Sequence, residues 1–146
     1  MASGKGNTNS AFLLASIYQA TFSGIANLLA NAGSPLTNLY VSLHTANPGA
    51  TGNQTTSEAA YTSYARVAVA RTSGGWTLTG ETITNAAAIN FPAATGGSET
   101  ETYVGIGTLA SGSGTLLWFG ALTSSLAVSS GITPSIAIGA LSVTES

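Results

Sequence analysis

His44 is the side chain best suited to acid–base chemistry, because it is the single histidine of the chain and imidazole titrates near neutral pH. A Ser–His–acid triad needs a carboxylate to orient the imidazole, but the sequence has no aspartate and no glutamate near His44. A zinc site would need more His or Cys ligands, and cysteine is absent. On an alternating strand, His44 shares a face with Tyr40 and Ser42. We therefore predict a partly exposed, hydrogen-bonding histidine without a catalytic role.

Glu99 and Glu101 are the densest acidic feature of the sequence. At positions i and i+2 of a strand both side chains lie on one face, as general acid–base catalysis could require. A calcium site would need more oxygen ligands than these two residues supply. We favour solubilising charges beside the glycine loop at residues 95–98. A small glycoside-processing enzyme would depend on this pair alone and ranks last among the functions considered.

The strongest candidates for contact with another protein are two arginines and several large apolar residues. Arg66 and Arg71 flank a predicted strand, and a guanidinium group suits bidentate pairing across an interface. Either arginine could instead pair with Glu81 inside the protein, and the residues leave this choice open. Trp76, Trp118 and Phe119 are expected mainly in the core. The candidate partner-interface residues are Phe12, Ile17, Arg66, Arg71, Trp118 and Phe119, and we predict no catalytic residue, metal ligand or cofactor.

The pattern of apolar residues divides the chain into three parts. Residues 1–9 are small and polar, which indicates a flexible N-terminal arm. Apolar residues then recur at spacings of three and four, which predicts a helical segment over residues 10–33. Residues 36–146 read as a β-sandwich domain of about seven to eight short strands with glycine-rich turns. Long crossovers favour a jelly-roll-like antiparallel arrangement, so the predicted fold is mainly β.

Several details of this sandwich follow from the strand pattern. Residues 50–63 form a long polar stretch that we expect to be an exposed loop. The segment 115–122 is apolar on both faces, so it should be central in the sandwich or cover an interface. A glycine-serine connection at residues 111–114 predicts a hairpin before it. In the last strand the alternation slips at Gly139, where a β-bulge would restore it.

Low charge is the main compositional feature. The 146 residues include three basic and five acidic side chains, with a net charge of −2, whereas about a quarter of an average domain is charged. Three separated cations provide no electrostatic surface for nucleic acid or anionic lipid. No window approaches about 20 consecutive apolar residues, and polar residues dilute the segment 11–30 too strongly for a signal peptide. Such a surface is suited to contact with other protein.

Five segments together resemble a family of small virion proteins of tailed bacteriophages. Residues 39–49 (LYVSLHTANPG) are similar to the family's VYVALHTADPG strand, with Asn47 in place of Asp. Residues 64–69 (YARVAV) resemble GYARVAV, and residues 85–94 (NAAAINFPAA) resemble NAAAVTFP. Residues 116–122 (LLWFGAL) and 139–145 (GALSVTE) match LLYWGALT and GALTVTE. Members are labelled head decoration (cement) proteins or tail fibre proteins.

The resemblance implies a virion structural protein that is not an enzyme. The first functional hypothesis is a capsid decoration protein, which binds across major capsid subunits and stabilises the head on its outer surface. The alternative is a tail-fibre or tail-tip component that recognises a host-surface glycan. Either protein would be made in the host bacterial cytoplasm and act in the virion. The expected partners are the major capsid protein and further copies of the chain, as a dimer or trimer, without nucleic acid or membrane.

Overall fold

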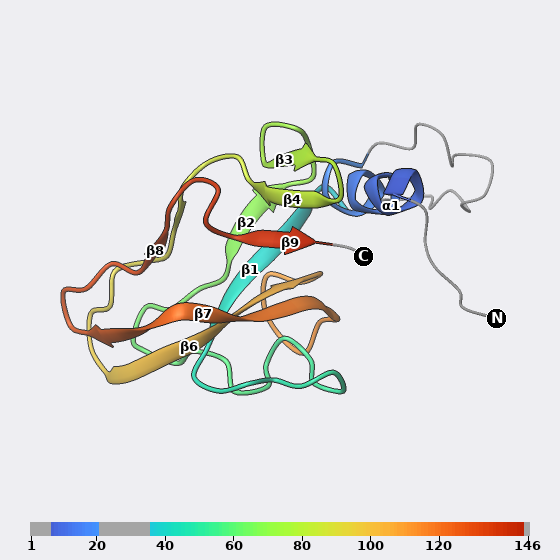
Figure 1. The fold of residues 1–146 in the computed structure, drawn as a ribbon. Helices are drawn as coiled ribbons and strands as arrows, with labels where there is room; N and C mark the ends of the chain where they lie inside the picture. The colour runs from blue at the N-terminus through green and yellow to red at the C-terminus, as the bar shows by residue number, and fades with distance from the viewer. Residues whose placement is uncertain (1–6, 21–35, 145–146) are drawn as a thin grey trace. The chain divides into compact units, whose positions relative to one another are not determined.

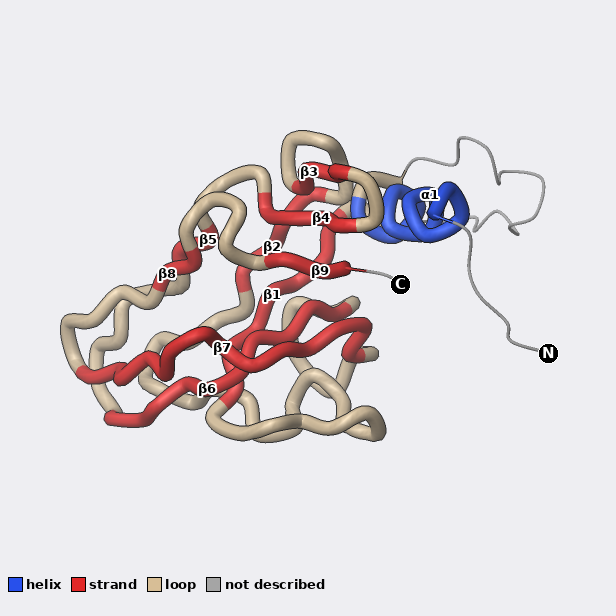
Figure 2. The backbone as a smooth tube through the Cα atoms, viewed as in Figure 1, coloured by secondary structure: helices blue, strands red, loops and turns tan. Residues whose placement is uncertain are grey.

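The computed structural model describes residues 7–20 and 36–144, and of residues 7–10 and 12 only the backbone. The described chain is mainly β, with antiparallel sheets and one short helix, α1 (Asn7–Tyr18) (Figures 1 and 2). The strands are β1 (Asn38–His44), β2 (Val67–Ala70), β3 (Trp76–Thr79), β4 (Thr82–Asn85), β5 (Ile89–Asn90), β6 (Ser98–Gly107), β7 (Leu116–Ser129), β8 (Ser135–Ile136) and β9 (Ser142–Thr144).

The chain contacts divide the protein into two compact units. The sheet unit contains Asn38–Val69 and Asn90–Ser135. The helix unit contains the described residues before position 38, together with Ala70–Ile89 and the C-terminal segment from Ile136. The strands form a four-stranded sheet in the order β2-β1-β6-β7, a three-stranded sheet in the order β3-β4-β9, and a pair of β5 with β8.

The core of the sheet unit is built on β1 and β6. These strands pair antiparallel, with Val41 opposite Ile106 and Leu43 opposite Val104, and all four side chains are buried. β6 continues into β7 through the connection 108–115, which confirms the predicted hairpin, and Figure 1 shows the two long strands side by side. β7 is an end strand of this sheet. The sequence-based alternative of a central strand at residues 115–122 is therefore wrong.

The helix unit packs α1 against the small β3-β4-β9 sheet. Tyr18, at the end of α1, meets Trp76 edge to face with ring centroids 4.7 Å apart, and both side chains are fully buried. Asn85, at the end of β4, is buried and donates to the carbonyls of Ala87 and Ala137 while its side-chain oxygen accepts from Leu141 N–H. One amide side chain thus fixes the C-terminal segment to β4.

Several boundaries differ from the sequence prediction. The described helix begins at Asn7 and ends at Tyr18; residues 21–33 of the predicted helical segment and residues 1–6 of the predicted arm lie outside the described residues. β7 extends to Ser129, seven residues beyond the predicted end. The expected bulge at Gly139 is instead a turn with a positive φ of 72°, which suits glycine. The jelly roll stays a prediction.

Candidate functional site

The most elaborate polar arrangement of the sheet unit surrounds Arg66 and Glu58. The Arg66 guanidinium donates to both carboxylate oxygens of Glu58, from Nε at 2.6 Å and from Nη2 at 2.7 Å. It also donates to the carbonyl oxygens of Leu109 at 2.9 Å and Gly112 at 2.8 Å. The Arg66 side chain is 2% exposed and that of Glu58 is 15% exposed. This bidentate pair is shielded from water and joins three segments of the chain, those of Glu58, Arg66 and the loop at residues 109–112. We call it the structural lock.

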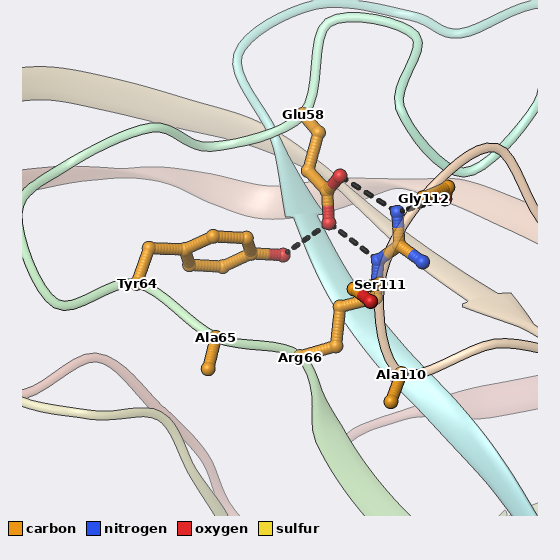
Figure 3. A pocket seen from close by; sticks show the side chains of 7 residues that line it. All are labelled: Glu58, Tyr64, Ala65, Arg66, Ala110, Ser111 and Gly112. Carbon is orange, nitrogen blue, oxygen red and sulfur yellow. Dashed lines mark hydrogen bonds and ion pairs between the residues drawn. The ribbon is translucent and has the colours of Figure 1, made fainter.

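Tyr64 completes this arrangement, as Figure 3 shows. Its hydroxyl donates to Glu58 Oε1 at 3.1 Å and accepts from the N–H of Leu43 on β1 at 3.1 Å. Burial raises the pKa of the Tyr64 hydroxyl, which therefore stays protonated. A hollow of about 220 Å³ lies over the lock, lined by Glu58, Tyr64, Ala65, Arg66, Ala110, Ser111 and Gly112. Because Glu58 and Arg66 are occupied by each other, the hollow offers a ligand little unpaired charge.

His44 is fully buried, so the prediction of a partly exposed histidine is wrong. Its Nδ1 lies 2.9 Å from the carbonyl oxygen of Thr56, which requires that Nδ1 carry the proton. Nε2 then accepts from the Ser42 hydroxyl at 2.9 Å. Burial lowers the pKa of His44, against smaller raising effects of the Thr56 carbonyl and Glu58. The loop carbonyl of Thr56 lies against this face of β1, which the alternation alone did not reveal.

The contact between Ser42 and His44 resembles part of a nucleophilic dyad, but it is inaccessible to a substrate. Both residues are 0% exposed. A Cβ added at Gly105 of β6 would lie 2.6 Å from His44 Nε2 and 2.7 Å from Ser42 Oγ. The backbone of β6 therefore lies directly against the two side chains and leaves no space for a reacting group. The dyad is a packing and hydrogen-bonding feature of the β1–β6 pair.

Gln54 is a second buried group that the sequence analysis missed. Its Oε1 accepts from the N–H groups of Thr108 and Leu109, and its Nε2 donates to the carbonyl of Leu109. The side chain is fully buried, so the prediction of an exposed loop at residues 50–63 is wrong in its centre. In a run of Thr, Ser, Asn and Gly, no pattern distinguishes a Gln that enters the core.

Glu99 and Glu101 have different environments although both lie on β6. Glu99 Oε1 accepts from the N–H groups of Ala60 at 2.8 Å and Tyr61 at 2.7 Å. Glu101 is 0% exposed, and no N–H or O–H group of another residue donates to either of its carboxyl oxygens. The prediction of two solubilising charges is therefore wrong for Glu101. The pKa of Glu101 is raised to about 8, first by burial and then by the Glu99 carboxyl.

The predicted interface residues are divided between the two units, with Ile17 and Arg71 in the helix unit and Arg66, Trp118 and Phe119 in the sheet unit. Arg66 pairs with Glu58 rather than Glu81. The Arg71 guanidinium donates to the carbonyls of Ser16, Ile17 and Leu36 at the C-terminal end of α1. The side chain of Ile17 is 38% exposed, Trp118 and Phe119 on β7 are partly exposed, and the side chain of Phe12 lies outside the described residues. A role for the six in binding a partner stays a prediction.

Two features are absent from the described residues. Within residues 7–20 and 36–144, no three His, Cys, Asp or Glu side chains gather in a group that could hold a metal ion. In the same residues no helix has the length and apolarity needed to cross a membrane. The buried polar groups of the sheet unit instead hold one another and the backbone of their loops.

A comparison with protein-family models finds a match to the podophage GP4 fiber I protein gp80 over residues 9–144. The chain belongs to this family. The match spans nearly all of the described residues, including both units. It makes the chain a small structural protein of a tailed-phage virion, as the five sequence segments indicated. No curated protein matches the chain.

Proposed function

We propose that the chain is a non-enzymatic structural subunit of a fibre in a tailed-phage virion, where it acts by binding other virion proteins. The observation that carries this proposal is the family match over residues 9–144, because the family is named for a fibre protein. The sequence analysis ranked capsid decoration first. The name of the family favours the fibre, which is the alternative to capsid decoration.

The buried polar groups support a structural role. The side chains that could do chemistry in the sheet unit are paired with each other or enclosed: Arg66 with Glu58, and His44 with Ser42. General acid–base catalysis needs a titratable group within reach of a substrate. Glu101 has a raised pKa but no exposed surface, so it cannot meet that requirement in this conformation.

The surface that we propose for assembly is the outer edge of β7. This strand has 14 residues, and residues 102–144 contain no charged side chain. Charges on an edge strand normally prevent strand addition, and β7 lacks them. Leu117 is 38% exposed, and Trp118 and Phe119 are partly exposed. A second copy can add its own β7 here without charge repulsion, which gives the expected dimer or trimer.

Capsid decoration is the second candidate, supported by the same low charge. A decoration protein would bind the major capsid protein on the outer surface of the head and stabilise the assembled lattice. A dry contact without unpaired ions suits either location, since buried charges without partners are costly. The predicted jelly-roll fold would serve both functions.

The copy number of the chain in purified virions, relative to the major capsid protein, separates the two candidates. Tail fibres are present in few copies, and we expect a small ratio together with antibody labelling at the tail. A ratio near one, lost together with the heat resistance of the head, would replace the fibre proposal by decoration.

The β7 edge is tested by comparing two exposed alanines on the two end strands of one sheet. Ala121→Lys places a charge on β7, and Ala68→Lys places the same charge on β2. We expect sedimentation to show an oligomer for the wild type and Ala68→Lys, and a monomer for Ala121→Lys. An oligomer that survives Ala121→Lys, or a monomeric wild type, would remove β7 from the proposal.

A further inference from the structure

Glu101 stands apart among the buried polar side chains of the sheet unit. His44, Gln54 and Arg66 are equally enclosed, and each has hydrogen-bond partners. No N–H or O–H group of another residue donates to either carboxyl oxygen of Glu101, and its one hydrogen-bonding neighbour is the carboxyl of Glu99. Desolvation of a carboxylate without a partner costs several kcal/mol, so a buried carboxyl in this position is stable only when it is neutral.

Glu99 is the neighbour of Glu101 on the same face of β6, two residues away. It is held in place by two backbone N–H groups, of Ala60 and Tyr61. The two side chains therefore differ in their environment. Glu99 accepts two backbone hydrogen bonds, whereas Glu101 is fully buried.

The segment that Glu99 holds is attached to the rest of the unit by a few contacts. The N–H of Thr62 donates to the carbonyl of Gly96, and the Tyr61 hydroxyl donates to the carbonyl of Pro92. A Cβ at Gly97 would lie 3.3 Å from the Tyr61 Cα, so the two segments are closely packed. Loss of the Glu99 contacts would remove the hydrogen bonds that join Ala60 and Tyr61 to β6.

Two titratable groups bear on the state of Glu101. Glu99 faces it from β6 itself, and Tyr61 faces it from the neighbouring segment; the pKa of Tyr61 is raised to about 12, first by burial and then by Glu101 and Glu99. On β7 the residue opposite is Leu126, which has no charge. The described cations, Arg66 and Arg71, are bound to other groups.

We propose that Glu99 and Glu101 form a proton-binding carboxyl pair that fixes residues 60–62 to β6 while it holds its proton, and loosens them when it ionises. The pair binds one proton, on Glu101, and releases it to water. The buried negative charge of Glu101 and the partly exposed charge of Glu99 then repel each other, and the ionised Glu101 requires water. Both effects pull Glu99 away from the N–H groups of Ala60 and Tyr61. This inference does not depend on where the chain lies in the virion.

The direction of the pH dependence follows from the raised pKa. Between 4.5, the ordinary glutamate value, and about 8, the unfolded chain has lost the proton of Glu101 and the folded chain retains it. Stability therefore falls as pH rises through this range, and Glu101 contributes no further change above it.

Carbon-13 NMR of the glutamate carboxyl carbons tests the proposal on the unmodified protein. We expect one carboxyl to titrate near pH 8, accompanied by a loss of exchange protection at the amides of Ala60 and Tyr61 after correction for the intrinsic exchange rate. Titration of all carboxyls below about pH 6 would contradict the proposal.

Two substitutions test whether the titration near pH 8 and the loss of amide protection arise from Glu101. In Glu101→Gln the titration near pH 8 should disappear and the two amides should stay protected at alkaline pH. Glu81→Gln makes the same chemical change in the helix unit and should preserve both observations. An alkaline loss of protection that persists in Glu101→Gln would overturn the proposal. Stabilisation of the wild type by millimolar calcium, abolished in Glu101→Gln, would overturn it in favour of a cation site.

Discussion

Two glutamates of the sheet unit, one partly shielded from water and one fully buried, compensate the loss of hydration in different ways. Glu58 receives two N–H groups of Arg66 and the hydroxyl of Tyr64. Glu101 receives no donor, although it is more deeply buried. The first carboxyl stays charged beside a guanidinium group, and the second is neutralised by a proton at pH values below about 8.

The difference shows that burial alone does not determine what a carboxyl contributes to stability. A paired carboxylate ties segments together, and removal of its partner leaves an uncompensated charge. A buried carboxyl without a donor fills space in the core while it is neutral at low pH. At high pH, where it would have to ionise, it lowers the free energy of unfolding. The two sites should therefore respond with opposite sign to the same substitution.

The largest expected effect is that of Arg66→Met. The change leaves Glu58 buried without its cation and the carbonyls of Leu109 and Gly112 without their donor. We expect a loss of about 3–5 kcal/mol in the free energy of unfolding. Urea unfolding at neutral pH measures it. In the double variant Glu58→Leu/Arg66→Met much of this loss should be recovered, and failure of that recovery would show that the carbonyls dominate.

Glu→Gln substitutions at the two sites give the sharpest comparison. Glu58→Gln weakens charge-assisted hydrogen bonds and should cost about 1.5–3 kcal/mol. Glu101→Gln should have the opposite sign above about pH 8, because an amide needs no proton to stay neutral. Thermal unfolding at alkaline pH measures both, with Glu81→Gln as the control. If Glu58→Gln and Glu101→Gln destabilised the protein by similar amounts, the two carboxyls would not differ in the way proposed here.

Neutral buried groups should be sensitive to volume rather than to charge. A Cβ at Gly107 would lie 2.2 Å from Gln54 Cδ, whereas one at Gly120 meets nothing within 4 Å. We expect Gly107→Ala to cost about 1–3 kcal/mol through overpacking and Gly120→Ala to change stability by about 0.5 kcal/mol or less. Denaturant midpoints of the two variants test this, and equal midpoints would mean that Gln54 moves aside without loss.

His44 should give the smallest effect and one of opposite pH dependence to Glu101. Because burial lowers its pKa below 6.5, only the unfolded chain takes up a proton as pH falls below that value. Stability then decreases towards acid, by no more than about 1.4 kcal/mol per pH unit. Unfolding of Glu101→Gln, with and without His44→Gln, isolates this slope. An unchanged slope after the loss of the imidazole would assign it elsewhere.

Strand positions were largely predictable because alternation depends only on neighbouring residues. The alternation that places Tyr40, Ser42 and His44 on one face belongs to a strand of the structure, β1. The buried phase of β1 at Leu39, Val41 and Leu43 also follows from the pattern. Charge content, the lack of cysteine and the virion family were equally available from the residues.

The polar core was not predictable, because its contacts join residues far apart in the chain. Gln54 meets Leu109, which is 55 residues away, and Glu99 meets Ala60, which is 39 residues away. The sequence analysis considered Glu81 as the internal partner of Arg66, and the structure selects Glu58. Loop residues carry no periodicity that would indicate their partners.

The sequence by itself determined that this is a nearly uncharged, mainly β protein of a tailed-phage virion family, since composition, alternation and motif order are properties of the linear chain. Only the tertiary structure decided that the second face of β1, with Ser42 and His44, is also enclosed, that β7 is an end strand, and which carboxyl keeps a proton. These depend on desolvation and on donors from distant segments, and both arise when the chain folds.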